Sequence, residues 1–270
     1  MKRVIPVFSR VSSLQFAEVV PPGERPRLRA EIFIVLGLSL GLSAVYSIIQ
    51  IIDLSTRSVP LSQQSTSLNT AQSSRQVFDF LYQVVGILGD LVPVALVGYL
   101  LWRVARPHLG ALGIDGRRPL ADSGWGVALA LVIGIPGILV YILGRQLGLT
   151  VNVVASGGDT YWWSIPVLLL SAARSGLQEE VIMIGYLYYR LNQLGWGRWK
   201  IIVFSALIRG SYHLYQGWGA FVGNLAMGIF FGWLYTRYGR LLPFVIAHFV
   251  IDAAIFVGYP WAAATFLSGL

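Results

Sequence analysis

Long apolar runs constrain this chain more than any other feature of its sequence. Hydrophobic residues make up 56% of it and charged residues only 12%, about half the charged share of an ordinary soluble domain. A soluble fold of this size could not bury so much apolar surface, so lipid is the expected solvent. The predicted fold class is all-α, a polytopic transmembrane helical bundle. Its seven expected spanning helices lie at residues 30–54, 77–104, 124–147, 161–191, 199–216, 218–235 and 241–259.

The basic residues lie in alternate loops between these runs. Short loops rich in Lys and Arg stay in the cytoplasm, so we expect a cytoplasmic amino terminus and an outer carboxyl terminus. The loop residues that carry this pattern are Arg25, Arg27, Arg29, Arg103, Arg106, Arg117, Arg118, Arg190, Arg198, Lys200, Arg237 and Arg240. We therefore attribute the net charge of +8 to the loops that set the membrane topology, and we expect no nucleic-acid partner.

The expected domain organisation is simple. Residues 1–29 form a basic cytoplasmic tail without the short apolar stretch of a secretory signal peptide. Residues 30–270 form one domain embedded in the lipid bilayer, and we expect a multi-pass protein of the bacterial cell membrane. Residues 55–76 and 150–160 are polar, and we interpret them as exposed loops.

Several ionisable residues lie at membrane depth, where a charge costs at least a few kcal/mol and therefore indicates function. Glu179 and Glu180 are adjacent in the fourth run, and His213 lies near the end of the fifth. His248 and Asp252 are four residues apart in the seventh run, so they share one helix face. For Asp90, alone in the second run, a solvated position near the interface is the favoured interpretation.

A glutamate with two histidines can activate water in two ways. The glutamate can act as a general base, or the residues can ligate a metal ion that acidifies the water. The chain contains no Cys, no His-Glu-x-x-His and no Gly-x-Ser-x-Gly, which excludes thiolate nucleophiles and leaves no local signature of a metal or serine site. No cofactor is expected, although zinc remains an alternative.

These residues resemble the motifs of the CAAX-protease and bacteriocin-processing (CPBP) family of intramembrane endopeptidases. The family carries Glu-Glu-x-x-x-Arg, Phe-x-x-x-His and His-x-x-x-Asn or Asp on successive core helices. Here the matching pairs are Glu179 with Glu180, Arg209 with His213, and His248 with Asp252. The resemblance places a CPBP-like core at about residues 160–258.

The resemblance implies a glutamate-dependent peptide hydrolase that cleaves a protein or peptide presented at the membrane. Glu179 and His213 would activate water for attack on the peptide carbonyl. His248 and Asp252 would stabilise the oxyanion, and Glu180 would orient the site.

Two positions depart from the family pattern. Ile184 stands where the first motif has Arg, and Arg209 stands where the second has Phe. A buried Glu180 needs a nearby cation, so we predict that Arg209 replaces the missing Arg as its partner. Alternatively, Arg209 extends its charge to the interface along its aliphatic stem, or the loss of the motif Arg has removed activity.

Two other functions use the same residues. A non-catalytic membrane scaffold or immunity factor would keep the fold without the chemistry. A transporter would relay protons through Glu and His, but it would be expected to have repeated halves, and the sequence contains no such repeat.

Overall fold

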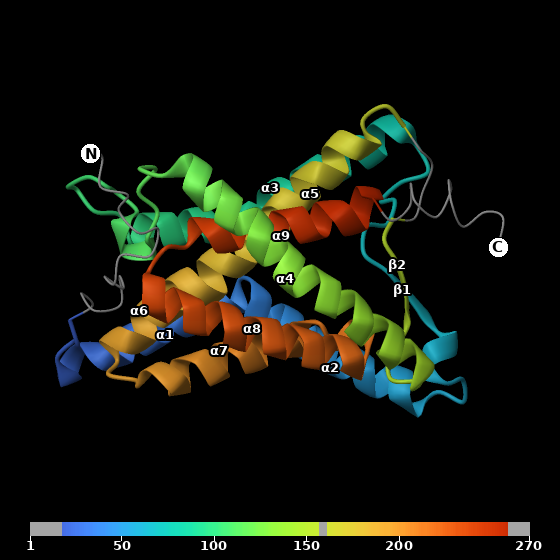
Figure 1. Cartoon of the computed structure of the whole chain (residues 1–270), viewed down its shortest axis with the longest axis horizontal. Helices are drawn as coiled ribbons and strands as arrows, with labels where there is room; N and C mark the ends of the chain where they lie inside the picture. The colour runs from blue at the N-terminus through green and yellow to red at the C-terminus, as the bar shows by residue number, and fades with distance from the viewer. Residues whose placement is uncertain (1–17, 157–160, 259–270) are drawn as a thin grey trace.

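The computed structural model describes residues 18–156 and 161–258. The chain is a bundle of α-helices in which α7 packs along α8 and α4 crosses the front of the bundle against α9 (Figure 1). The α-helices are α1 (Arg25–Gly37), α2 (Leu40–Thr56), α3 (Gln76–Leu100), α4 (Pro119–Gln146), α5 (Ser164–Glu179), α6 (Leu187–Gln193), α7 (Arg198–Tyr212), α8 (Trp218–Tyr238) and α9 (Leu242–Ala253). Short 3₁₀ turns are η2 (Pro22–Glu24), η3 (Leu61–Gln63), η4 (Gly110–Leu112) and η6 (Leu214–Gln216).

Each of the seven predicted apolar segments is helical, which confirms the all-α fold class. Three described helices, α3, α4 and α8, are long and apolar enough to cross a membrane by themselves, and a fourth span results if α1 and α2 are taken together. Large apolar side chains such as Leu131, Ile135 and Ile138 face outward along α4. Lipid is the solvent that suits such a surface, so the protein is an integral membrane protein. The count of seven spans stays a prediction.

The first predicted span is not one straight helix. It is broken into α1 and α2, which meet at an angle of 57°. The break lies at Leu38 and Ser39, where the Ser39 hydroxyl turns back to donate to the Val35 carbonyl at 2.6 Å. The helix also begins at Arg25, inside the segment expected to be a tail. Residues 1–17 of that predicted tail lie outside the described residues.

The predicted alternation of the loops is visible in the fold. At one end, Arg190 joins α6 to α1 and α3, because its Nε donates to Glu31 at 2.8 Å and its Nη2 to the Leu100 carbonyl at 3.4 Å. The loop before α4 and the loop after α8 meet at the same end (Figure 1). Which end faces the cytoplasm stays a prediction.

At the opposite end, the two polar loops form a short two-stranded sheet that the all-α prediction did not include. Strands β1 (Ser65–Ser67) and β2 (Asn152–Val154) pair in parallel. Thr150 forms a bridge with Gly217, the residue after η6. These contacts fasten the turn that follows α7 to the loop after α4, and they hold the polypeptide near His213 in place.

Two π-helical stretches interrupt the helices that carry the predicted motifs. The stretch η5 (Glu180–Tyr186) connects α5 to α6, and all seven of its residues are buried. The stretch η7 (Ala254–Gly258) directly follows α9 and begins two residues after Asp252, the second motif residue of that helix. Such stretches widen the helix locally and occur frequently at functional sites.

Arg240 ties together three segments at the basic end of the bundle. Its guanidinium donates to both carboxylate oxygens of Asp122 at 2.8 and 2.6 Å and to Asp115 at 3.0 Å. Burial raises the pKa of Asp115, but the hydrogen bonds from Arg240 outweigh this effect and leave the pKa below its usual value. The Asp115 carboxylate therefore remains an acceptor over the physiological pH range.

Gly113 permits the close approach that this cluster needs. Its φ is +73°, and an added Cβ would lie 1.9 Å from the carbonyl oxygen of Gly239. We expect Gly113→Ala to lower the melting temperature in detergent by several degrees, since the left-handed conformation alone costs an L-residue about 1–2 kcal/mol. Gly116 is the matched control, because its φ is +63° but nothing lies near its Cβ. Equal losses in the two alanine variants would contradict a contribution from the close approach.

Candidate active site

A close contact between α5 and α9 brings the predicted motifs together. An added Cβ on Gly176 would lie 2.9 Å from the Val245 carbonyl oxygen and 3.1 Å from the Phe249 nitrogen. The lack of a side chain at this position therefore lets α9 lie directly against α5, one turn before the two glutamates. His248 lies between Val245 and Phe249 along α9, and its ring faces Glu180.

Glu180 is the most enclosed charge in the site. Its Oε1 lies 2.7 Å from Arg209 Nη2 and accepts a second hydrogen bond from His248 Nδ1 at 2.8 Å. The side chains of Glu180 and Arg209 are 0% and 1% exposed. The predicted contact between Arg209 and Glu180 is therefore present. The alternative in which Arg209 extends to the interface is wrong, because its guanidinium is fully enclosed.

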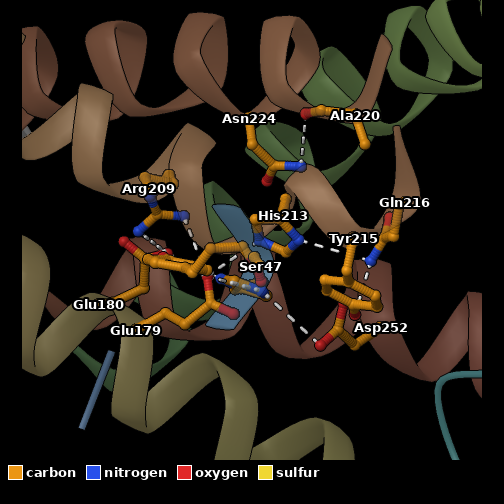
Figure 2. A network of polar contacts seen from close by, with 12 residues as sticks. Ser47, Glu179, Glu180, Arg209, His213, Tyr215, Gln216, Ala220, Asn224 and Asp252 are labelled. Atoms are coloured by element: carbon orange, nitrogen blue, oxygen red, sulfur yellow. Dashed lines mark hydrogen bonds and ion pairs between the residues drawn. The ribbon is translucent and has the colours of Figure 1, made fainter. Parts of the chain in front are cut away.

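Glu179 presents a carboxylate oxygen to both histidines. Glu179 Oε2 accepts a hydrogen bond from the Tyr212 hydroxyl at 2.7 Å, and it lies 3.6 Å from His213 Nε2 and 3.9 Å from His248 Nε2. Neither imidazole contact is short enough for a hydrogen bond. His213 Nε2 is buried and has no hydrogen-bond partner among the described residues. Figure 2 shows the carboxylate and the His213 ring lying next to each other.

His248 and Asp252 share a helix face, as their spacing predicts. His248 Nε2 lies 3.6 Å from Asp252 Oδ2. Because Nδ1 of the same ring contacts the carboxylate of Glu180, which can only accept, Nδ1 carries a proton. Nε2 therefore faces Glu179 and Asp252, and it is the nitrogen available to a substrate.

The buried charges of this cluster do not balance by themselves. The cluster contains three carboxylates, of Glu179, Glu180 and Asp252, and one enclosed guanidinium, that of Arg209. Charges out of contact with water need compensation, and Arg209 supplies one positive charge to three carboxylates. Such a site can accept, hold and return protons, which is what general acid and base chemistry requires.

Among residues 18–156 and 161–258, no group of three or more His, Asp or Glu is arranged to hold a metal ion. The zinc alternative therefore receives no support from the geometry. The expectation that no cofactor is needed stays a prediction.

Tyr212 and Ser47 also lie at this site, although the sequence analysis did not identify them. Tyr212 precedes His213 and donates to Glu179, whereas Ser47 in α2 donates to the Tyr212 carbonyl at 3.0 Å. No signal in the sequence indicates the direction of a tyrosine hydroxyl. A hydroxyl 165 positions away has no motif of its own.

Asp90 lies apart from the buried cluster. Its side chain is 52% exposed and pairs with Arg174 of α5 at 3.5 Å, and the solvated position near the interface stays a prediction. No pattern in the sequence connects these two residues.

The comparison with known protein families identifies the same part of the chain. Residues 161–254 match the family described as type II CAAX prenyl endopeptidase, Rce1-like. No curated protein and no solved structure matches the chain. Every acidic and basic group of the buried cluster lies inside the matched segment. The match to the Rce1-like type II CAAX prenyl endopeptidase family therefore covers residues 161–254, and it is consistent with the predicted resemblance to the CPBP family.

Proposed function

We propose that the protein is an intramembrane endopeptidase in which Glu179 activates water for attack on a peptide bond. The observation that carries the proposal is the pair of facing atoms Glu179 Oε2 and His213 Nε2, which lie 3.6 Å apart without bonding to each other. A water molecule that contacts both atoms can give its proton to Glu179 while its oxygen attacks the carbonyl carbon.

The oxyanion that forms needs a hydrogen-bond donor that is already in place. His248 has this role, because Nδ1 is held by Glu180 and Nε2 faces the reacting atoms. Nε2 donates when the ring is an imidazolium, a state that the surrounding carboxylates favour. A carboxylate cannot donate, so Asp252 acts through His248 by stabilising its positive charge. The proton taken by Glu179 then passes to the leaving amine, and the peptide bond breaks.

The remaining groups position Glu179. The Tyr212 hydroxyl fixes one carboxylate oxygen, and Arg209 holds Glu180, the neighbour of Glu179 along the chain. The substrate is a protein or peptide presented by the membrane, since the site lies among helices whose outer surface is apolar. No step requires a metal ion or another cofactor.

The proposal is tested by following the oxygen of water. The full chain in lipid nanodiscs is incubated with proteome-derived peptides in H₂¹⁸O, and new carboxyl termini are read by mass spectrometry. We expect one ¹⁸O atom at each new terminus, with cleavage that persists in the presence of a metal chelator. No new terminus with well-folded protein favours the scaffold, and loss of cleavage on chelation followed by return with zinc favours the metal mechanism.

A further inference from the structure

Gln216 lies beside the candidate active site, and the proposed mechanism gives it no role. It is the last residue of η6, the turn that follows His213. Its backbone is held on both sides, because its carbonyl accepts a hydrogen bond from Val151 N at 3.1 Å and its nitrogen donates to the His213 carbonyl at 3.0 Å. The side chain extends from this fixed backbone toward the His213 ring (Figure 2).

The amide of Gln216 has two acceptors for its two hydrogens. Nε2 lies 2.7 Å from the Tyr215 hydroxyl oxygen and 3.5 Å from Nδ1 of His213. The second contact is long, but an amide nitrogen can only donate, so Nδ1 is the acceptor in it. Nδ1 therefore carries no proton, and the single proton of the neutral ring lies on Nε2.

The opposite edge of the His213 ring favours the same tautomer. Nε2 lies 3.6 Å from Glu179 Oε2, and a carboxylate can only accept a hydrogen bond. A proton on Nε2 is attracted to this negative charge, and a bare lone pair is repelled by it. Nε2 is also buried without a hydrogen-bond partner among the described residues. Because a buried donor without a partner is costly, this N–H needs an acceptor that enters the site, and the reacting water is one.

We propose that Gln216 is a positioning residue that holds neutral His213 with its proton on Nε2. The inference rests on the proposed function and deepens it, because it gives a direction to each hydrogen bond at the reacting water. The Nε2–H of His213 donates to the water oxygen, while the water donates to Glu179 Oε2. One lone pair of the water is then left to attack the carbonyl carbon, and its direction is fixed by the other two contacts. In this arrangement Glu179 is the base and His213 orients the water.

The tautomer can be measured without a substrate. The chain contains only three histidines, so ¹⁵N NMR of the histidine-labelled full chain in nanodiscs gives few signals, and His213→Ala identifies those of His213. At mildly alkaline pH we expect a neutral ring with its proton on Nε2. A proton on Nδ1, alone or together with one on Nε2, would overturn the inference, because the Gln216 amide would then have to present its oxygen to the ring.

Two substitutions test whether Gln216 sets this tautomer. Gln216→Met keeps the length of the side chain and removes both hydrogen bonds. We expect its His213 proton to be divided between the two nitrogens, and kcat to fall about 3- to 10-fold with little change in KM, the effect of one lost hydrogen bond. Gln216→Glu has the same shape but only accepts when ionised, so it should draw a proton onto Nδ1. Absence of an Nδ1 proton in that variant would contradict the contact between residue 216 and the ring.

Gln63→Met is the matched control. Gln63 is also the last residue of a 3₁₀ turn, η3, but it is exposed, so this variant should keep the tautomer, kcat and melting temperature of the wild type. An unchanged tautomer in Gln216→Met would assign its control to Glu179 alone and overturn the inference. A loss of kcat that is fully explained by a smaller folded fraction would also overturn it. Absence of any cleavage by the folded wild type would instead contradict the proposed function, and the spectra would still decide the tautomer.

Discussion

Glu179→Gln is expected to lower peptide cleavage about 100- to 10,000-fold, the usual contribution of a general base. The amide keeps the size of the side chain, and its oxygen can still accept the hydrogen bond from Tyr212 at the distance of 2.7 Å seen for the carboxylate. It cannot take a proton from water. The loss should therefore fall on kcat, measured with the full chain in nanodiscs on any peptide that the wild type cleaves.

The control for this variant is Glu24→Gln, the same chemical change at an exposed residue near the start of α1. It should leave both activity and melting temperature unchanged. Full activity in Glu179→Gln would assign the base to another residue. A large fall in melting temperature with the loss of activity would indicate that Glu179 supports the fold rather than the reaction.

Arg209→Met should destabilise the protein by about 3–5 kcal/mol, the usual effect of removing one partner from a buried ion pair. The change leaves Glu180, 0% exposed, without its guanidinium partner, although His248 still contacts it. A lower melting temperature in detergent is the expected measurement, together with loss of cleavage. Unchanged stability and activity would contradict the assigned pairing.

A double variant tests whether Arg209 replaces the motif Arg. Ile184→Arg with Arg209→Phe restores the family pattern at both positions. The two helices are adjacent here, because the Ser205 hydroxyl, one turn before Arg209, donates to the Met183 carbonyl at 2.7 Å. A guanidinium can thus reach Glu180 from either side. The double variant should be more stable and more active than either single variant, whereas a simple sum of the two single losses would refute the replacement.

The sequence predicted the parts of this molecule that depend on hydrophobicity and short spacing. The seven helical segments follow from apolar runs, and the shared face of His248 and Asp252 follows from the helical repeat. The partner of Glu180 followed from the need of a buried carboxylate for a cation. The missing motif Arg and the extra Arg209 indicated which cation it was.

Other features depend on contacts between distant segments, and no local pattern encodes them. The bend at Ser39, the early start of α1 at Arg25 and the paired strands depend on tertiary packing. The hydroxyl of Tyr212 reaches Glu179 because α7 packs against η5, which begins directly after Glu179. The pairing of Asp90 with Arg174 required the placement of α3 against α5.

The central claim is that the Glu179 carboxylate makes this protein a protease. The most direct measurement compares protein termini in membranes of cells that lack the chain, express the wild type, or express Glu179→Gln at equal abundance. The catalytic mechanism predicts termini that only the wild type generates, with Glu179→Gln cells indistinguishable from cells that lack the chain. Wild-type termini, or a wild-type phenotype, in the Glu179→Gln cells would contradict the mechanism and favour a non-catalytic scaffold.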